Sequence, residues 1–453
     1  MRPRTLRWVA EATGGRLGGA DAEVRGATSD SRQVRPGDLF VAIRGERTDG
    51  HDHVDAAFAA GAAGALVSDR EGFTGPVVVV EDTGAALLSL GAAHRRTMDA
   101  EVVGITGSAG KTSVKDLTAA VLAARFRTAS SPKSFNTDVG VPLTLLNAPD
   151  DAEVVVCEMG SRGRGHIARL CEVARPRVGA VTNVGLAHLE MFGSPEAVAD
   201  AKAELVESLP TDGVAILNAD DPVVTRFGER TTASVLRFGR SVEADVRATD
   251  LSLDRLGRPS FTLMTPDGAE RVELAVVGEH MASNALAASA VGVALGLSAG
   301  ECAAALKEAR VSRWRMEVRE TPSGVVVVND AYNANPASMA AALKSARWMA
   351  GEGRSIAVLG EMAELGAASR DEHERVGELV ARLGIDRLIV VGAAARPIAV
   401  GAAREGVEPE RITTCDTIDE AEAAVSSVAG RGDVVLVKGS RVVGLEHLAE
   451  ALT

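Results

Sequence analysis

The chain has 453 residues, 46% of them hydrophobic, which is enough for several packed domains of roughly 100–200 residues each. Its formal net charge is −13, and no run of lysine and arginine forms a basic stripe. This balance argues against a nucleic-acid-binding protein, because contacts with phosphates need clustered cations.

The four cysteines and the apolar stretches indicate the compartment. Cys157, Cys171, Cys302 and Cys415 stand far apart without a Cys-x-x-Cys pair, which is typical of buried thiols rather than a disulfide framework or a zinc site. The N-terminus lacks an apolar stretch of signal-peptide length, and the uncharged run 281–300 is too rich in alanine, serine and glycine to favour a membrane span. We therefore expect a cytoplasmic protein with no membrane span.

Residues 1–98 predict a small α/β domain of their own. An apolar strand over 39–43 and a helix that begins near Val54 flank the polar turn 49–51. The two histidines beside this turn have no neighbouring carboxylate or cysteine cluster that would complete a metal site. We therefore interpret the turn as loop residues that cap a ligand-binding edge.

A phosphate-binding loop stands at the start of the second domain. The stretch 101–124 reads as a strand, a small-residue loop and a helix with an apolar face. Backbone N–H groups at the helix start favour anions, Lys111 would reach the β- and γ-phosphates, and the Thr112 hydroxyl would bind Mg²⁺. The pattern is a shortened P-loop, because the full motif has glycine five residues before Gly110 and position 105 is isoleucine.

Residues 99–311 predict a central domain with a parallel sheet, and polar side chains follow two of its strands. The strand over 153–157 ends at Glu158, and the strand over 178–182 leads to His188. Because ligands bind beyond the carboxyl ends of parallel strands, both side chains would reach the edge that carries the phosphate loop. A carboxylate there is a natural Mg²⁺ ligand.

Lys202 is an anomaly in the helix that opens with Ser194 and Pro195. It lies in register with the apolar side chains of that helix, where a free ammonium would cost several kcal/mol or lose its proton. Either the lysine snorkels to the surface, or it is modified or paired because it faces the active site.

From residue 312 to 453 four apolar strands alternate with helical stretches, which predicts a second, Rossmann-like parallel sheet. The fold class expected for the whole chain is therefore α/β with three domains. They are a small N-terminal α/β domain (1–98), a central P-loop mononucleotide-binding domain with a parallel sheet (99–311) and a C-terminal Rossmann-like domain (312–453).

Six motifs together resemble the Mur ligases of peptidoglycan synthesis. They are GITGSAGKTS, VCEMGSRGRGHI, TNVGLAHLEMFGS, AKAEL, GEHMASNALAA and NDAYNANPASM. The resemblance covers nearly the whole chain, in three domains of the expected order. Within the family, DAYNANPASM and LGEMAELG are similar to the member that adds a dipeptide. The Asp-Asn-Pro-Arg-like sequence of the member that adds the third residue does not occur, nor does the Asp-Gly-Ala-His-Asn-Pro of folylpolyglutamate synthetase.

The resemblance implies an ATP-dependent amide ligase that joins D-alanyl-D-alanine to UDP-N-acetylmuramoyl-tripeptide through an acyl phosphate. This would be the last cytoplasmic step in building the peptidoglycan pentapeptide precursor, and so a contribution to cell shape and division. ATP and Mg²⁺ are the expected cofactors, and a monomer is expected. Two alternatives stay open, namely a Mur ligase that adds a single amino acid and an ATP-dependent regulatory module that does not ligate. Whether the third residue of the tripeptide is diaminopimelate or lysine is also open.

The resemblance also assigns the catalytic residues. Lys111 would stabilise the transferred phosphoryl group, Thr112 and Glu158 would hold one Mg²⁺, and His188 would hold the second. Lys202 matches the lysine that is carbamylated in these ligases, and a carbamate would turn a costly cation into an anionic Mg²⁺ ligand.

Two further sets of positions match the family's binding residues. The nucleotide set comprises Gly107, Ser108, Ala109, Gly110, Lys111, Thr112, Ser113, Asn284, Arg315, Asp330, Asn333 and Asn335. The set for the UDP-sugar peptide comprises Asp30, Ser31, Arg32, Thr48, Asp49, Gly50, His51 and, near the peptide, Asn136. Around Arg315 the sequence is VSRWRMEV, so Arg313 competes for the assigned role.

Overall fold

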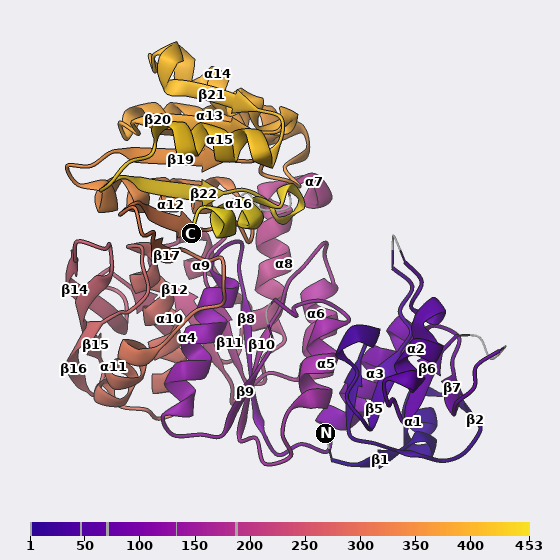
Figure 1. Ribbon diagram of the computed structural model, residues 1–453. Helices are drawn as coiled ribbons and strands as arrows, with labels where there is room; N and C mark the ends of the chain where they lie inside the picture. The colour runs from indigo at the N-terminus through magenta and orange to yellow at the C-terminus, as the bar shows by residue number, and fades with distance from the viewer. Residues whose placement is uncertain (1, 46–47, 69–71, 133, 186–188) are drawn as a thin grey trace.

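A computed structural model describes residues 2–45, 48–68, 72–132, 134–185 and 189–453 (Figure 1). Three main sheets organise these residues. The C-terminal part, orange to yellow in Figure 1, lies over one end of the central part, and the N-terminal part lies at its side. The α/β class expected from the sequence is confirmed.

The N-terminal part is built on a five-stranded sheet of order β2-β7-β6-β5-β4, in which β4 to β7 run parallel and β2 is antiparallel. Its strands are β1 (Arg4–Thr5), which pairs with β3, β2 (Arg16–Gly18), β3 (Glu23–Val24), β4 (Gly26–Thr28), β5 (Asp38–Val41), β6 (Gly64–Val67) and β7 (Val77–Val79). Its helices are α1 (Leu6–Thr13), α2 (Val54–Ala59) and α3 (Thr83–Arg95), with short 3₁₀ turns η1 (Ser31–Gln33) and η2 (Gly50–His53).

The central part contains a nine-stranded sheet of order β16-β15-β14-β13-β12-β11-β8-β10-β9. The seven neighbouring strands from β14 to β9 in this order, β8 included, run parallel. Its strands are β8 (Glu101–Thr106), β9 (Thr128–Ser130), β10 (Val154–Glu158), β11 (Val178–Val181), β12 (Val214–Asn218), β13 (Ser234–Gly239), β14 (Val246–Leu253), β15 (Pro259–Thr265) and β16 (Gly268–Glu273). Its helices are α4 (Lys111–Ala123), α5 (Gly140–Asn147), α6 (His166–Ala174), α7 (Leu189–Phe192), α8 (Pro195–Glu207), α9 (Pro222–Thr225), η3 (Arg226–Arg230), α10 (His280–Ala294) and α11 (Ala299–Glu308).

The C-terminal part has a six-stranded sheet of order β17-β18-β22-β19-β20-β21, in which only β17 is antiparallel among the described strands. Its strands are β17 (Glu317–Glu320), β18 (Val326–Asn329), β19 (Ser355–Leu359), β20 (Arg387–Val391), β21 (Ile412–Cys415) and β22 (Val434–Lys438). Its helices are α12 (Pro336–Ala350), η4 (Gly366–Ala368), α13 (Ser369–Arg382), η5 (Ala393–Ala395), α14 (Arg396–Arg404), η6 (Pro409–Arg411), α15 (Ile418–Val428), η7 (Arg441–Val443) and α16 (Leu445–Ala451).

Helix α5 connects the N-terminal and central parts. Its residues Leu143 and Leu146 are buried in the same apolar cluster as the N-terminal strands. Its last residue, Asn147, accepts a hydrogen bond from the Ala27 N–H at 3.0 Å and donates one to the Ala27 carbonyl at 2.7 Å. Helix α5 follows residue 98 in the chain, but it packs into the core formed by residues before 98. A domain boundary near residue 98 therefore remains a proposal.

The uncharged run 281–300 lies inside the central part. It makes up most of α10, which packs against α4 in one continuous core. Within the described ranges, no helix is long and apolar enough to cross a membrane. All four cysteines belong to those ranges, and they are buried and unpaired, as the sequence predicts.

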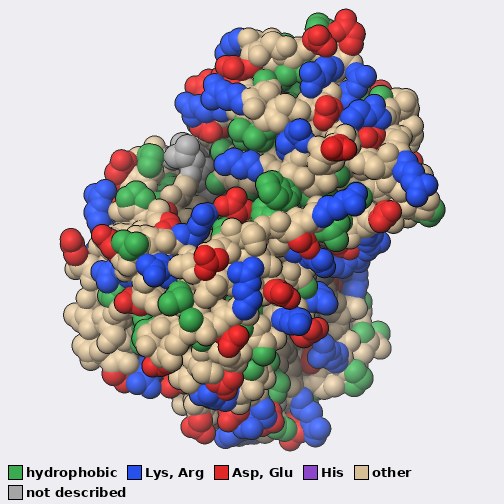
Figure 2. Space-filling model, turned by 90° about the vertical axis from the view of Figure 1, so that its left-hand side faces the viewer, with side chains coloured by type: hydrophobic (Ala, Val, Ile, Leu, Met, Phe, Trp, Pro, Cys, Tyr) green, Lys and Arg blue, Asp and Glu red, His purple; other side chains and the backbone are tan. Residues whose placement is uncertain are grey.

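Charged side chains of both signs are interspersed over the face of the molecule in Figure 2. Many charged side chains of the described chain form ion pairs, as Arg125 does with Glu301 at 2.6 Å. Surface pairs of this kind contribute about 0–1 kcal/mol each, so the fold depends on its apolar cores.

His94, near the end of α3, makes stability depend on pH. It is 3% exposed, and burial lowers its pKa from 6.5 to about 4. Between these values the unfolded chain binds a proton that the folded chain does not, so stability falls as the pH falls. Between pH 7 and pH 5 we expect urea unfolding to show a loss of about 2 kcal/mol that His94→Leu removes.

The matched control is His447→Leu, because the His447 side chain is 73% exposed. That variant should keep the full pH dependence of wild type. Equal pH dependence in His94→Leu and wild type would contradict the assignment to His94.

Candidate active site

A cavity of about 810 Å³ lies between the central and C-terminal parts. The carboxyl ends of both sheets supply its walls. From the central sheet come the loop after β8, Glu158 at the end of β10 and Asn183 after β11, and from the C-terminal sheet come Asp330 after β18 and Lys438 at the end of β22. Two mostly parallel sheets therefore present the carboxyl ends of their parallel strands, where ligands usually bind, to one cavity.

The loop between β8 and α4 forms the expected anion-binding turn. Gly110 caps α4 with φ +80°, and a Cβ there would lie 2.7 Å from Asn284 Oδ1. A Cβ on Gly107 would lie only 2.0 Å from the Thr182 hydroxyl. Asn183 fixes the loop further, because its Oδ1 accepts from the Ala109 N–H at 2.9 Å. Close packing against β11 and α10 therefore explains both glycines.

Lys111, the first residue of α4, folds back over the loop. Its Nζ donates to the Gly107 carbonyl at 2.7 Å. Burial lowers its pKa, which nearby Glu158 opposes. A half-buried ammonium whose described hydrogen-bond partner is a backbone carbonyl is suited to exchange that carbonyl for phosphate oxygens.

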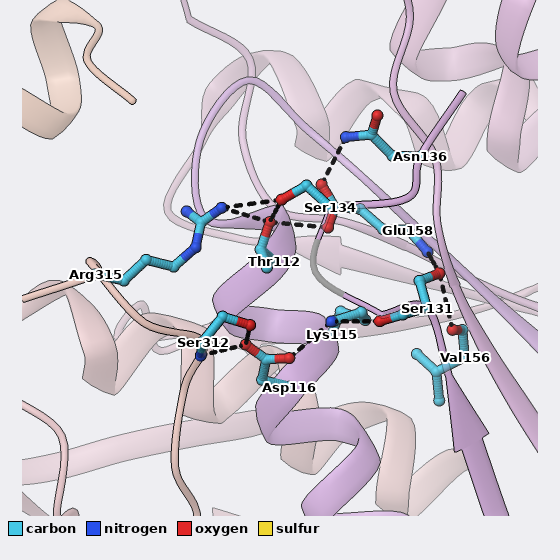
Figure 3. Close-up of polar contacts among 10 residues, drawn as sticks. All are labelled: Thr112, Lys115, Asp116, Ser131, Ser134, Asn136, Val156, Glu158, Ser312 and Arg315. Carbon is cyan, nitrogen blue, oxygen red and sulfur yellow. Dashed lines mark hydrogen bonds and ion pairs between the residues drawn. The ribbon is translucent and has the colours of Figure 1, made fainter. Parts of the chain in front are cut away.

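Glu158 and Thr112 meet at the base of the cavity (Figure 3). The Thr112 hydroxyl donates to Glu158 Oε2 at 2.8 Å, and the Asn136 amide donates to Oε1 at 2.8 Å. Thr112 is 3% and Glu158 1% exposed, so both side chains are largely shielded from water. Their hydroxyl and carboxylate oxygens are hard metal ligands. Such donors suit Mg²⁺.

Arg315 enters the site from the C-terminal part (Figure 3). Its Nη2 donates to the Thr112 hydroxyl at 2.8 Å and to the Ser134 hydroxyl at 3.2 Å, and its guanidinium lies 4.3 Å from the Tyr332 ring centroid. Arg313 instead pairs with Glu450 at 3.0 Å and is absent from the described cavity lining. Of the two arginines that the sequence left in competition, the structure brings Arg315 to the phosphate loop.

Lys202 is buried on α8 with 1% exposure. Its Nζ donates to Ser161 Oγ at 2.9 Å, and in the described chain it has no carboxylate partner. Burial lowers its pKa well below the usual value, and the nearby Lys111 ammonium adds to this effect. Of the two alternatives open from the sequence, snorkelling to the surface is excluded.

Part of the expected metal site falls outside this description. His188 lies outside the described residues. Among the residues that are described, no three His, Cys, Asp or Glu side chains form a group that could hold a metal. The metal assignments therefore remain proposals, carried by the donor chemistry of Thr112 and Glu158.

The nucleotide set from the C-terminal part also lines the cavity. Asp330 pairs with Lys438 at 2.6 Å, and Lys438 also donates to the Asn333 carbonyl at 3.0 Å. Asn335 uses its side chain to cap α12 by accepting from the Ser338 N–H. These residues line the cavity together with Asn284 from α10.

The residues expected at the UDP end do not join this cavity. Its described lining includes Asn136 but none of Asp30, Ser31, Arg32, Thr48, Asp49, Gly50 and His51. They instead form two turns of the N-terminal part. In one, Asp30 caps η1 and binds the Arg32 guanidinium at 2.9 Å, which holds the pKa of that carboxyl well below its usual range.

In the other turn, Asp49 Oδ1 contacts His51 Nδ1 at 2.5 Å, and His51 Nε2 accepts from the Ser68 N–H at 2.9 Å. The imidazole thus joins the turn to the end of β6. No metal is needed to explain its position.

Sequence reasoning missed several residues that line the cavity. They are Ser134, Arg162, His166, His280, Tyr332, Glu364 and Lys438. Most of them belong to motifs that the sequence did single out, but only the fold brings those motifs together. Lys438 had a signal of its own, because it is a charged residue that ends an apolar strand.

The fold and site define a P-loop enzyme whose nucleotide site is completed by a second α/β domain. Family comparison agrees, since the Mur ligase middle domain matches residues 105–292, the Mur ligase glutamate ligase domain matches 314–441 and the Mur ligase family catalytic domain matches 23–123. The chain belongs to the Mur ligase family.

Individual relatives show which members of the Mur ligase family this chain is similar to. UDP-N-acetylmuramoyl-tripeptide–D-alanyl-D-alanine ligase of Mycobacterium tuberculosis is 42% identical, with 99% of this chain and 97% of the relative covered. MurF from Acinetobacter baumannii has a similar crystal structure, with a TM-score of 0.90 and 30% identity over 100% of this chain and 99% of that one. MurF ligase from Thermotoga maritima in complex with ADP has a TM-score of 0.81 and 29% identity, with 94% and 96% covered.

Proposed function

We propose that this chain is the ATP-dependent ligase that joins D-alanyl-D-alanine to UDP-N-acetylmuramoyl-tripeptide. The observation that carries the proposal is the convergence of the phosphate loop, Glu158 and Arg315 on one cavity between two domains. The full-length similarity to ligases of this name supports the choice of substrates.

The reaction requires activation of the tripeptide carboxylate, which is a poor acyl donor. The tripeptide carboxylate attacks the γ-phosphorus of ATP, so that a C(O)O–P bond forms and ADP leaves. The amine of D-alanyl-D-alanine then attacks the acyl carbon, loses a proton and expels phosphate, which leaves an amide. Both steps depend on alignment and on neutralising phosphoryl charge rather than on a protein nucleophile.

The chain's own groups fit these needs. Backbone N–H groups of the loop 107–113 would hold the phosphates, with Lys111 and Arg315 as cations on the transferred group. Asn284 and Asp330 would hold the nucleoside, with Asn333 and Asn335 at the adenine side. Asp30 and His51 with their neighbouring turn residues would hold the uridine diphosphate end, and Asn136 would lie near the peptide.

Two Mg²⁺ sites complete the proposal. Thr112 and Glu158 would hold one ion, and His188 with a carbamylated Lys202 would hold the other. Bound there, Mg²⁺ would neutralise charge that develops on the phosphoryl oxygens. We also place the enzyme in the cytoplasm, where ATP is available, and expect a monomer by light scattering.

The defining experiment measures phosphate release and product mass with ATP, Mg²⁺ and UDP-N-acetylmuramoyl-tripeptide. We expect turnover with D-alanyl-D-alanine at least about 100-fold above that with any single amino acid, because unfilled binding groups cost several kcal/mol. Supplying the tripeptide with diaminopimelate or with lysine at position three identifies the natural acceptor.

Two outcomes would contradict the proposal. Preference for a single amino acid would identify another Mur ligase activity. ADP release without a new amide would favour the regulatory module.

A further inference from the structure

Ser312, in the segment between α11 and β17, is held by a side chain of the phosphate-loop helix. Asp116 Oδ2 accepts from both the Ser312 N–H at 2.8 Å and the Ser312 hydroxyl at 2.7 Å (Figure 3). The two residues lie 196 positions apart in the chain. Asp116 stands four residues after Thr112 on α4, so both side chains lie on one face of the helix.

Arg315 follows Ser312 by three residues and contacts that same Thr112 hydroxyl. The segment is therefore attached to α4 at two points, one turn of helix apart. The Ser312 contact lies away from the cavity lining, whereas the Arg315 contact lies inside it. The contact of Ser312 with Asp116 thus fixes the segment outside the cavity, and the contact of Arg315 with Thr112 lies within the cavity. We call the contact of Ser312 with Asp116 the holding contact.

The backbone around Arg315 is strained. Trp314 and Met316 have φ values of +61° and +52°, a left-handed conformation that is unfavourable for residues other than glycine. Strain of this kind persists only where surrounding contacts over-determine it. The Met316 N–H donates to Asp330 Oδ1 at 3.0 Å on one side, and the Ser312 contact with Asp116 lies on the other.

Asp116 is itself fixed by a buried ion pair. Its Oδ1 lies 2.8 Å from Nζ of Lys115, whose side chain is 2% exposed. Lys115 Nζ also donates to the Ser131 carbonyl at 2.7 Å, and the Ser131 hydroxyl accepts from the Glu158 N–H at 3.2 Å. The holding contact is thus continuous with the backbone that positions Glu158 (Figure 3).

We infer that Asp116 is a positioning residue that latches Ser312, so that the strained segment 314–316 delivers Arg315 to the phosphate end of the site. It acts through Arg315 and touches no reacting atom. The inference rests on the proposed function for its kinetic consequence, but its structural consequence can be measured without any substrate.

The structural test uses the fluorescence of Trp314. In a Trp8→Phe, Trp348→Phe background, Trp314 is the only tryptophan, and it stacks with Arg441 at 4.3 Å and Arg313 at 5.6 Å. Asp116→Asn should shift its emission and raise its acrylamide quenching. Ser312→Ala, which removes only the hydroxyl, should do the same to a smaller extent and keeps the test valid if Asp116→Asn folds poorly.

The kinetic test uses phosphate release by the full-length enzyme. Asp116→Asn should lower kcat/KM for ATP about tenfold, equivalent to about 1.4 kcal/mol, and Asp116→Glu should recover part of it. Because Asp116 acts through Arg315, adding Asp116→Asn to Arg315→Ala should cause no further loss. A residue that only stabilises the fold would give additive losses.

Glu301→Gln is the matched control, since Glu301 pairs with Arg125 beyond the far end of α4 and lies outside the cavity lining. It should change neither the emission nor kcat/KM. Unchanged Trp314 fluorescence in both Asp116→Asn and Ser312→Ala, or additivity with Arg315→Ala, would overturn the inference. Absence of ligation by the wild-type enzyme would overturn the proposed function and leave the fluorescence result standing.

Discussion

Replacing Glu158 by glutamine should lower kcat for ligation by about 10²–10³-fold while the protein still folds. The side chain is 1% exposed, and each of its oxygens accepts a hydrogen bond, from Thr112 and from Asn136. Glutamine has the same shape and keeps an oxygen acceptor, but it lacks the negative charge by which a carboxylate binds Mg²⁺ more tightly. Phosphate release at saturating substrates measures the loss, and a thermal melt checks the fold.

Glu153→Gln is the control, because Glu153 lies just before the other end of β10 and pairs with Arg127 on the surface at 3.3 Å. It should keep wild-type activity. Raising the Mg²⁺ concentration should recover part of the Glu158→Gln activity, because weaker binding is offset by mass action. Activity of Glu158→Gln within tenfold of wild type, a difference of about 1.4 kcal/mol, would contradict the proposed role of Glu158 as a Mg²⁺ ligand.

Lys202→Ala should be nearly inactive, and a short carboxylic acid such as acetate or propionate should restore part of the rate. Burial lowers the pKa of the Lys202 amine well below its usual value, which increases the fraction of neutral amine. The neutral amine attacks CO₂, an N–C bond forms, and loss of one proton leaves a carbamate. An added acid would place a carboxylate in the vacated space.

A second measurement is independent of activity. Enzyme equilibrated with ¹³C-bicarbonate should show a carbamate carbon signal that is absent from Lys202→Ala and present in Lys307→Ala, an exposed control on α11. Since carbamates lose CO₂ in acid, the signal and the activity should fall together as the pH is lowered. Full activity in CO₂-free buffer with no such signal would exclude carbamylation of Lys202.

Local sequence was enough to predict the elements that carry the site. The strand, loop and helix around Lys111 follow from apolar runs broken by glycine, and β10 ends at Glu158 as its apolar run predicts. The helix with Lys202 begins after the Ser194 cap with Pro195 in its first turn. These signals lie within a few residues of one another, where backbone propensity and periodicity decide the outcome.

The sequence also determined the membership of the Mur ligase family, because six motifs in a fixed order are far more specific than any one of them. The sequence also drew attention to Lys202, because a charged side chain stands there among the apolar positions of a helix. A lysine in register with apolar residues either snorkels to the surface or is buried at a cost, and the structure shows that Lys202 is buried.

Only the tertiary structure decided which distant residues meet. Arg313 and Arg315 are both chemically suited to bind phosphate, and the left-handed backbone at Trp314 and Met316 directs one to Thr112 and leaves the other at Glu450. The contact of Asp116 with Ser312 joins positions 196 residues apart, and no periodicity in either segment encodes it. Such pairings depend on how the central and C-terminal sheets pack against each other, which the local sequence of either sheet does not determine.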